Sequence, residues 1–244
     1  MSQDGIQISP ANKHCLAKVE QSQALADLAL LTELGQLNQL TQWVEQDALR
    51  MQALLVCAQV FAKLNITDWA IAAGFVRNLV WDKLHGFSTS ELSGLNDIDV
   101  IYYCEKNITQ AQDKHIQQIL LSLMPLNWSV KNQARMHIRN QDPQYHSCLD
   151  AMGYWPEKQT AIAVKLNAVN VNPQHASYSV NVKTGSCISA NTLEFIHAFE
   201  LTCLFNFSLS HNPKRSSSIF EQRVIQKKWL ERYPKLILQP TAKT

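Results

Sequence analysis

Short apolar runs rich in β-branched and aromatic residues alternate along this chain with segments of helical periodicity. Runs of roughly four to eight such residues are typical of strands, and apolar residues that recur every three or four positions indicate amphipathic helices. Strands separated by helices predict an α/β or α+β domain, in which helices flank a β-sheet. The clearest strand candidates are residues 69–73, 95–103, 128–131 and 160–166.

Helices are expected between and around these strands, and a hairpin is expected late in the chain. Gly185 marks the turn of that hairpin, between residues 177–182 and 186–189. A polar loop, residues 88–94, precedes the second strand. The expected helices are residues 24–34, 41–64, 75–84, 109–123, 191–207 and 219–233.

The length of the chain suits a single large domain with additions at both ends. Its 244 residues can bury a full hydrophobic core. We expect residues 1–45 to form a leader and an N-terminal helical extension, residues 46–236 to form the domain, and residues 237–244 to form a C-terminal tail.

The composition argues against several classes of function. A formal net charge of +2 is close to neutral, so there is no strong nucleic-acid signature. No apolar stretch reaches the roughly 18 residues of a membrane span, and the polar N-terminus lacks the features of a signal peptide. The six cysteines include no C-x-x-C pair, which favours reduced thiols and a cytoplasmic location over disulfides or a zinc site.

Two acidic residues, Asp97 and Asp99, lie in the apolar run 95–103. Side chains at positions i and i+2 of a strand point to the same face, so the two carboxylates should project together. Two anions so near to each other are unfavourable unless a proton or a cation lies between them. Hard oxygen ligands favour Mg²⁺ or Mn²⁺, so the pair predicts a metal site.

A second pattern about twenty residues upstream consists of a strand, a glycine and a helix. Gly74 allows its backbone to approach a ligand closely, and the helix that begins there presents free N–H groups that suit phosphate. Arg77 lies in the first turn of this helix, where its planar guanidinium can hold two phosphate oxygens. The two patterns together predict a phosphate site beside a metal site.

Each part also has a purely structural explanation. Gly74 can simply form a turn, and Arg77 can be a surface ion-pair partner. Asp97 can end a turn and leave Asp99 facing solvent. The order of the parts, each within an apolar strand or at its end, favours the functional interpretation.

These two patterns resemble those of the polymerase-β-like nucleotidyltransferase superfamily, and are similar to those of the head domains of tRNA CCA-adding enzymes and bacterial poly(A) polymerases. A broader similarity, over about residues 50–236, is to a bacterial family of nucleotidyltransferase-like proteins. The segments that carry it are 73–78, 80–82, 84–86, 96–100, 131–137, 155–157, 160–161, 212–213, 223–224 and 227–229.

The resemblance implies a mixed β-sheet flanked by helices, with Mg²⁺ or Mn²⁺ and a nucleoside triphosphate in its cleft. By position, Asp97 and Asp99 would be catalytic and hold the metals. The phosphates would lie against the segment that contains Gly74, Phe75, Arg77 and Asn78. Phe75 stands where the superfamily usually has a second small residue, so the phosphate site would be narrower.

The superfamily generally uses a third carboxylate, as a base or a further metal ligand, and residues 128–131 contain none. Asp150 is the favoured candidate, with helix capping as its structural alternative. Glu157 is the second candidate, and we expect it to be exposed.

The segment that follows residues 128–131 is rich in hydrogen-bond donors. At the edge of a nucleotide cleft, Lys131 or Arg135 could bind phosphate, and Asn132 or Gln133 could hydrogen-bond a base or ribose. The structural alternative is a solvated connection. For Lys227 and Lys228, the simplest interpretation is solubilising surface charge.

Three functions compete on these grounds. The leading hypothesis is an enzyme that uses Mg²⁺ to transfer a nucleoside monophosphate from a triphosphate to an unknown acceptor, which could be a small molecule, a protein or RNA. The alternative is a catalytically inactive nucleotide-binding or protein-interaction module on the same fold. An RNA-tailing enzyme is disfavoured, because the chain has no room for a separate helical RNA-binding body and no strongly basic surface is evident.

Overall fold

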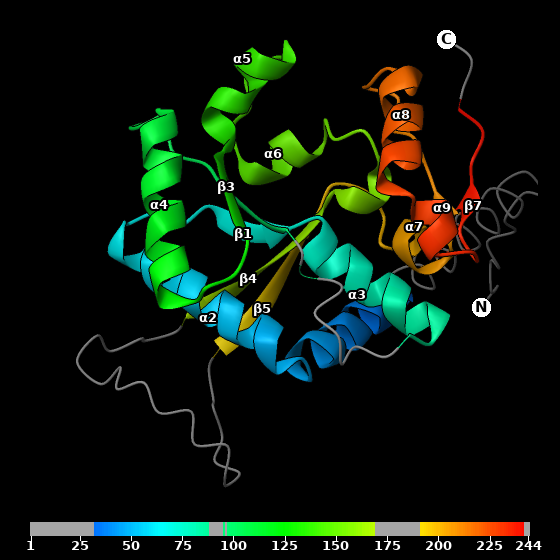
Figure 1. Ribbon diagram of the computed structural model, residues 1–244, viewed down its shortest axis with the longest axis horizontal. Helices are drawn as coiled ribbons and strands as arrows, with labels where there is room; N and C mark the ends of the chain where they lie inside the picture. Colours follow the sequence, from blue (N-terminus) through cyan, green and yellow to red (C-terminus); the bar gives the residue numbers. More distant parts are fainter. Residues whose placement is uncertain (1–31, 88–94, 96, 169–190, 242–244) are drawn as a thin grey trace, which may run out of the picture.

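A five-stranded mixed sheet forms the centre of the molecule in the computed structural model, which describes residues 32–87, 95, 97–168 and 191–241 (Figure 1). The strand order is β3-β2-β1-β4-β5. Strands β2 and β3 are parallel, whereas the other neighbouring strands are antiparallel. This arrangement confirms the predicted α+β fold. The strands are β1 Trp69–Ala72, β2 Ile98–Tyr102, β3 Trp128–Asn132, β4 Ile162–Ala168 and β5 Asn191–His197.

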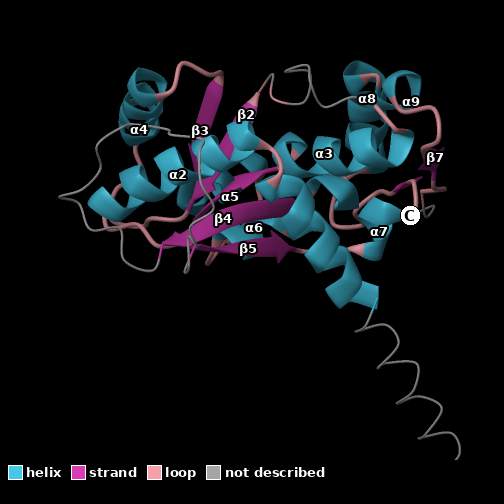
Figure 2. Ribbon diagram, turned by 90° about the horizontal axis from the view of Figure 1, so that it is seen from below, coloured by secondary structure: helices cyan, strands magenta, loops and turns pink. Residues whose placement is uncertain are grey.

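Helices surround the sheet, and a short second sheet lies near the C-terminus. Helix α4 lies beside β3, and α7, α8 and α9 lie together at the opposite end of the molecule (Figure 2). Residues 32–45 are also helical. The other helices are α2 Ala48–Lys63, α3 Gly74–His85, α4 Gln110–Leu123, α5 Met136–Asn140, α6 Cys148–Met152, α7 Thr202–Phe205, α8 Ser217–Lys227 and α9 Trp229–Arg232.

The two-residue strands β6 Ser208–Leu209 and β7 Ile237–Leu238 pair in parallel. The single turns η2 Gln133–Arg135 and η3 Lys158–Thr160 are 3₁₀ helices. None of the described helices combines the length and apolar composition that crossing a membrane requires.

The two faces of the sheet differ in what covers them. Alternate residues of β2, namely Ile98, Val100 and Tyr102, pack into the large hydrophobic cluster that also takes side chains from α2, α3 and α4. The opposite face carries Ile101 and the small alanines of β1, and α6 packs there in a smaller cluster. Because side chains alternate along a strand, Asp99 belongs to this second, less filled face.

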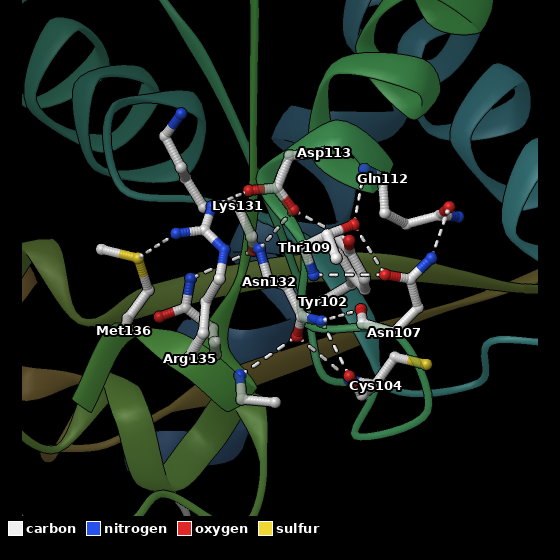
Figure 3. A network of polar contacts seen from close by, with 12 residues as sticks. Tyr102, Cys104, Asn107, Thr109, Gln112, Asp113, Lys131, Asn132, Arg135 and Met136 are labelled. Atoms are coloured by element: carbon white, nitrogen blue, oxygen red, sulfur yellow. Dashed lines mark hydrogen bonds and ion pairs between the residues drawn. The ribbon is translucent and has the colours of Figure 1, made fainter. Parts of the chain in front are cut away.

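A buried polar network fixes the chain where it leaves β3 (Figure 3). Asp113 of α4 is 3% exposed, accepts hydrogen bonds from the Tyr102 hydroxyl at 2.8 Å and the Asn132 backbone N–H at 3.1 Å, and forms an ion pair with Arg135. The Asn132 side chain bonds the backbone of Cys104 and also that of Asn107 and Ala134. The network therefore ties α4, β2, β3 and η2 together.

The predicted helix over residues 191–207 is wrong. Residues 191–197 form β5, which pairs with β4 along its whole length, and only Thr202–Phe205 are helical. Leu193 and Phe195 pack against the large cluster whereas Ile196 packs against the smaller one, so the side chains alternate with a period of two. The unpaired backbone edge of β4 decides the outcome, because its N–H and C=O groups need partners.

Two predicted helices are each divided in the structure. The predicted helix 41–64 breaks after residue 45, and the Asp47 side chain accepts a hydrogen bond from the Arg50 N–H at 3.0 Å to begin α2. The predicted helix 219–233 breaks at Lys228, which has a φ of 52° and separates α8 from α9.

The predicted strand 69–73 and helices 75–84 and 109–123 are confirmed to within a few residues as β1, α3 and α4. The hairpin 177–189 and the loop 88–94 lie outside the described residues.

Candidate nucleotide-binding site

A cleft of about 460 Å³ lies where β1 passes into α3. Its walls come from four parts of the chain: the start of α3, strands β2 and β3 with the following α5, the segment 155–160, and helices α8 and α9. The register places Ala72 of β1 opposite Asp99 of β2, and Asp99 opposite Ser129 of β3. The glycine motif and the acidic motif therefore meet at the same end of the sheet.

Asp97 and Asp99 both line this cleft. Asp97 is exposed just before β2 and accepts a hydrogen bond from Asn127 Nδ2 at 2.6 Å. Burial raises the pKa of Asp99, and the charge of Asp97 raises it further, whereas a hydrogen bond from Ser129 and the charges of Lys227 and Arg77 oppose the rise. Two neighbouring carboxylates, one of them resisting ionisation, are a donor set that a divalent cation would stabilise.

The size of this donor set also bears on which metal would fit. Within the described residues, no group of three or more His, Cys, Asp or Glu side chains is arranged to hold a metal ion. Mg²⁺ is commonly held by only one or two carboxylates, with water and substrate phosphates as its other ligands. The pair therefore fits a magnesium ion that is bound together with a phosphate substrate.

The turn from β1 into α3 brings backbone close to the cleft. Ala73 has a φ of 55°, a conformation that residues with a side chain rarely adopt, and its N–H donates to the Ile162 carbonyl at 2.9 Å. A Cβ atom added to Gly74 would lie 3.2 Å from Asn78 Nδ2 and 3.6 Å from Arg77 Nη2. The missing side chain thus leaves room for Asn78 and Arg77, which also line the cleft.

Arg77 is held in a fixed orientation. Its Nη1 donates to Thr160 Oγ1 at 3.1 Å, and its Nε and Nη2 donate to Asn78 Oδ1 at 3.2 and 2.9 Å. Its guanidinium lies 5.1 Å from the ring centroid of Trp81 and 4.6 Å from that of Trp229. Burial lowers its pKa to about 10, so the group is still a cation at neutral pH.

Glu157 is the third carboxylate of the cleft, and the prediction that it is exposed is wrong. It is 0% exposed, forms an ion pair with Arg223 and accepts a hydrogen bond from Thr160 Oγ1 at 3.0 Å. Arg223 and Lys227 of α8 line the cleft as well, as does Arg232 of α9. Lys227 was predicted to be a solubilising surface charge, and the structure places it in the lining of the cleft.

Comparison with known proteins gives the family. Residues 59–238 match a family described as nucleotidyltransferase. The chain belongs to this family. The match confirms the resemblance that the two motifs indicated.

A solved structure is similar in fold to this nucleotidyltransferase family member. It is an NMR structure described as revealing a CCA-adding enzyme head domain, with 23% sequence identity and a TM-score of 0.62, and the match covers 84% of this chain and 96% of that one. A search of curated proteins found no match.

Four predicted site residues of this family member are not brought to the cleft that the described residues form. Phe75 is fully buried in the hydrophobic core, and Asn132 and Arg135 belong to the network around Asp113 (Figure 3). Asp150 lies on α6, where its Oδ2 accepts from the His146 N–H at 2.9 Å, as expected of a local cap. This geometry gives no support to Asp150 as the third carboxylate.

The other predicted residues of the donor-rich segment reach the cleft. Lys131 lines it from β3, and the neighbouring Gln133 lines it from η2. Sequence reasoning had not assigned Arg223 a role. The only sequence signal for Arg223 was the similarity of residues 223–224 and 227–229 to the family. That similarity does not indicate which residues these side chains contact.

Proposed function

We propose that this protein is a metal-dependent nucleotidyltransferase that transfers a nucleoside monophosphate from a nucleoside triphosphate to an acceptor. The observation that carries the proposal is the convergence in one cleft of Asp97 and Asp99 with Gly74 and Arg77. The family match and the head-domain fold support it. The acceptor would be a small molecule, a protein or RNA.

The residues of the cleft would have distinct roles in this reaction. Asp97 and Asp99 would hold Mg²⁺ or Mn²⁺, which when bound neutralises phosphate charge and polarises the reacting oxygens. Arg77, whose guanidinium packs against the rings of Trp81 and Trp229, would hold non-bridging phosphate oxygens. An acceptor oxygen would bond to the α-phosphorus as the bond from that phosphorus to the bridging oxygen breaks, releasing pyrophosphate.

Calorimetry of each ribonucleoside triphosphate with and without Mg²⁺ tests the proposal. We expect metal-dependent binding that disappears in the double variant Asp97→Ala/Asp99→Ala. Glu231→Ala is the control, because Glu231 has a 71% exposed side chain whose ion pair is with Lys228, outside the cleft. Identical binding by the wild type and the double variant would defeat the proposal.

An inactive nucleotide-binding or protein-interaction module is the second candidate. It is favoured by Glu157, whose oxygens are engaged by Arg223 and Thr160 and so are poorly placed to act as a base. Incubation with labelled triphosphates, Mg²⁺ or Mn²⁺ and a cell extract separates the two. Pyrophosphate release or a labelled product supports the enzyme, whereas binding without turnover supports the module.

A further inference from the structure

The cleft is richer in cations than the two motifs account for. Its charged lining residues are five cations and three carboxylates, and two of the cations, Arg223 and Lys227, lie on α8, about 150 residues from Arg77 in sequence. Lys227 lines the same cleft as Asp97 and Asp99, and its charge opposes the rise in the pKa of Asp99. Helix α8 therefore adds positive charge to the cleft that contains the acidic motif.

A single buried carboxylate links the two arginines. Glu157 pairs with Arg223 through Nε and through Nη2, the latter at 3.3 Å. Glu157 Oε2 also accepts from Thr160, which in turn accepts from Arg77 Nη1. This chain of contacts joins α3 to α8 through the segment 157–160. A buried carboxylate with both oxygens bonded holds its partners in one geometry.

Arg223 and Lys227 retain donors for a ligand. The Arg223 side chain is 35% exposed, and among the described residues it hydrogen-bonds only to Glu157, so Nη1 has no protein acceptor there. Lys227 is exposed on the last turn of α8 and forms no ion pair with any described residue. Guanidinium and ammonium groups that converge in a small cleft suit the oxygens of a polyphosphate.

We propose that α8 supplies the second half of a polyphosphate site, in which Arg223 and Lys227 bind phosphate opposite Arg77 and Glu157 is the positioning residue for both arginines. The inference rests on the proposed function, because it takes the polyphosphate to be that of the nucleoside triphosphate. Glu157 is accordingly neither a base nor a metal ligand, although it is the third carboxylate of the cleft.

Two adjacent lysines provide the matched test. Lys227 lines the cleft, whereas Lys228 pairs with Glu231 and does not line it. Binding of inorganic tripolyphosphate to the full chain is measured by calorimetry in EDTA. We expect Lys227→Gln to weaken binding at least fivefold and Lys228→Gln to change it less than twofold. Equal effects of the two variants, which remove the same charge, would overturn the proposal.

Glu157→Asp tests positioning, because it keeps the charge and shortens the side chain. We expect at least a fivefold loss of tripolyphosphate affinity with Mn²⁺ affinity within twofold of the wild type, since Asp97 and Asp99 are untouched. A parallel loss of both affinities, or wild-type affinity for tripolyphosphate, would contradict a positioning role. Arg223→Gln, on a partly exposed side chain, is the second variant, and wild-type affinity in it would also overturn the proposal.

These measurements separate the inference from the function on which it rests. Tripolyphosphate binding measured in EDTA depends neither on a metal ion at Asp97 and Asp99 nor on turnover. If Lys227→Gln weakens tripolyphosphate binding while Asp97→Ala/Asp99→Ala leaves nucleotide binding intact, the proposed function fails and the phosphate site stands. If the double variant abolishes nucleotide binding while Lys227→Gln behaves like Lys228→Gln, the phosphate site fails and the function stands.

Discussion

At the scale of single residues, the cleft contains positions that suit a ligand better than they suit the fold. Asp99 is a carboxylate that burial and a neighbouring anion push toward its neutral form. Ala73 adopts a backbone conformation that costs energy for any residue with a side chain. Both lie beside the cleft, where β1 ends and β2 begins.

Asp99→Asn is expected to stabilise the metal-free protein at pH 7. A carboxyl whose pKa is raised by folding binds its proton more tightly in the folded state, so stability falls as pH rises from the unfolded pKa, about 4, through the raised folded value. We expect a gain of about 1 kcal/mol, or about 2–4 °C in melting temperature, that vanishes as pH falls toward 4. Thermal unfolding in EDTA measures it, and a lower melting temperature for the variant at pH 7 would contradict it.

Gly74→Ala is expected to weaken nucleotide binding while the fold is retained. The added Cβ would press on Asn78 and Arg77, whose orientations the phosphate site requires. Alanine is otherwise favourable in a helix, by about 1 kcal/mol over glycine in the interior. Gly35→Ala is the matched control, since a Cβ at Gly35 meets nothing within 4 Å. Measured by calorimetry, nucleotide binding should be several-fold weaker in Gly74→Ala and unchanged in Gly35→Ala.

At the scale of elements, buried polar contacts decide how the strands and helices are joined. Asp113 connects α4 to β2, to β3 and to η2 (Figure 3). It lies on the large-cluster side of the sheet, away from the cleft face, since its partner Tyr102 belongs to that cluster. The network therefore supports the path of the chain from β3 to α5 and only indirectly the cleft.

Asp113→Ala is expected to destabilise the protein by about 3–5 kcal/mol. It would leave Arg135 without its anion and Tyr102 without its acceptor, both largely buried. Chemical denaturation with circular dichroism detection measures the loss. Lys114→Ala, one residue along on an exposed position, should change stability by less than about 0.5 kcal/mol. Similar losses in both variants would show that the network has no special role.

At the scale of the whole molecule, the cleft exists only because distant segments meet. Asp99, Glu157 and Arg223 come from β2, from the approach to β4 and from α8. The ion pair between Glu157 and Arg223 holds α8 against the segment 155–160 at this cleft. A ligand that bridges the α3 and α8 walls should therefore stabilise the fold as a whole.

Mg²⁺ with the preferred nucleoside triphosphate should raise the melting temperature of the wild type. At a free ligand concentration of 100 times Kd the gain is about 2.7 kcal/mol, or about 5–10 °C for a chain of this size. In Asp97→Ala/Asp99→Ala the shift should be lost. Differential scanning calorimetry over a ligand series measures it, and a shift that is equal in both proteins would argue against metal-assisted binding.

The motifs with strong local patterns were predictable from the sequence. The glycine that begins α3 and the acidic pair at β2 are set by short-range spacing, and the structure brings both to one cleft. Residues 191–197 were not predictable, because their apolar positions fit a helical period as well as a strand and only the open edge of β4 decides between them. Asn132 and Arg135 carried donors suited to a ligand, but their partners proved to be within the protein.

By itself, then, the sequence determined the fold class, the family and the residues of the two motifs, because these depend on periodicity and on neighbours a few positions apart. Only the tertiary structure decided which charges share the cleft. Glu157 and Arg223 are 66 positions apart, and neither carries a local sign that the other is its partner. Ion pairing and burial act through space, so α8 became part of the site only when the chain had folded around the sheet.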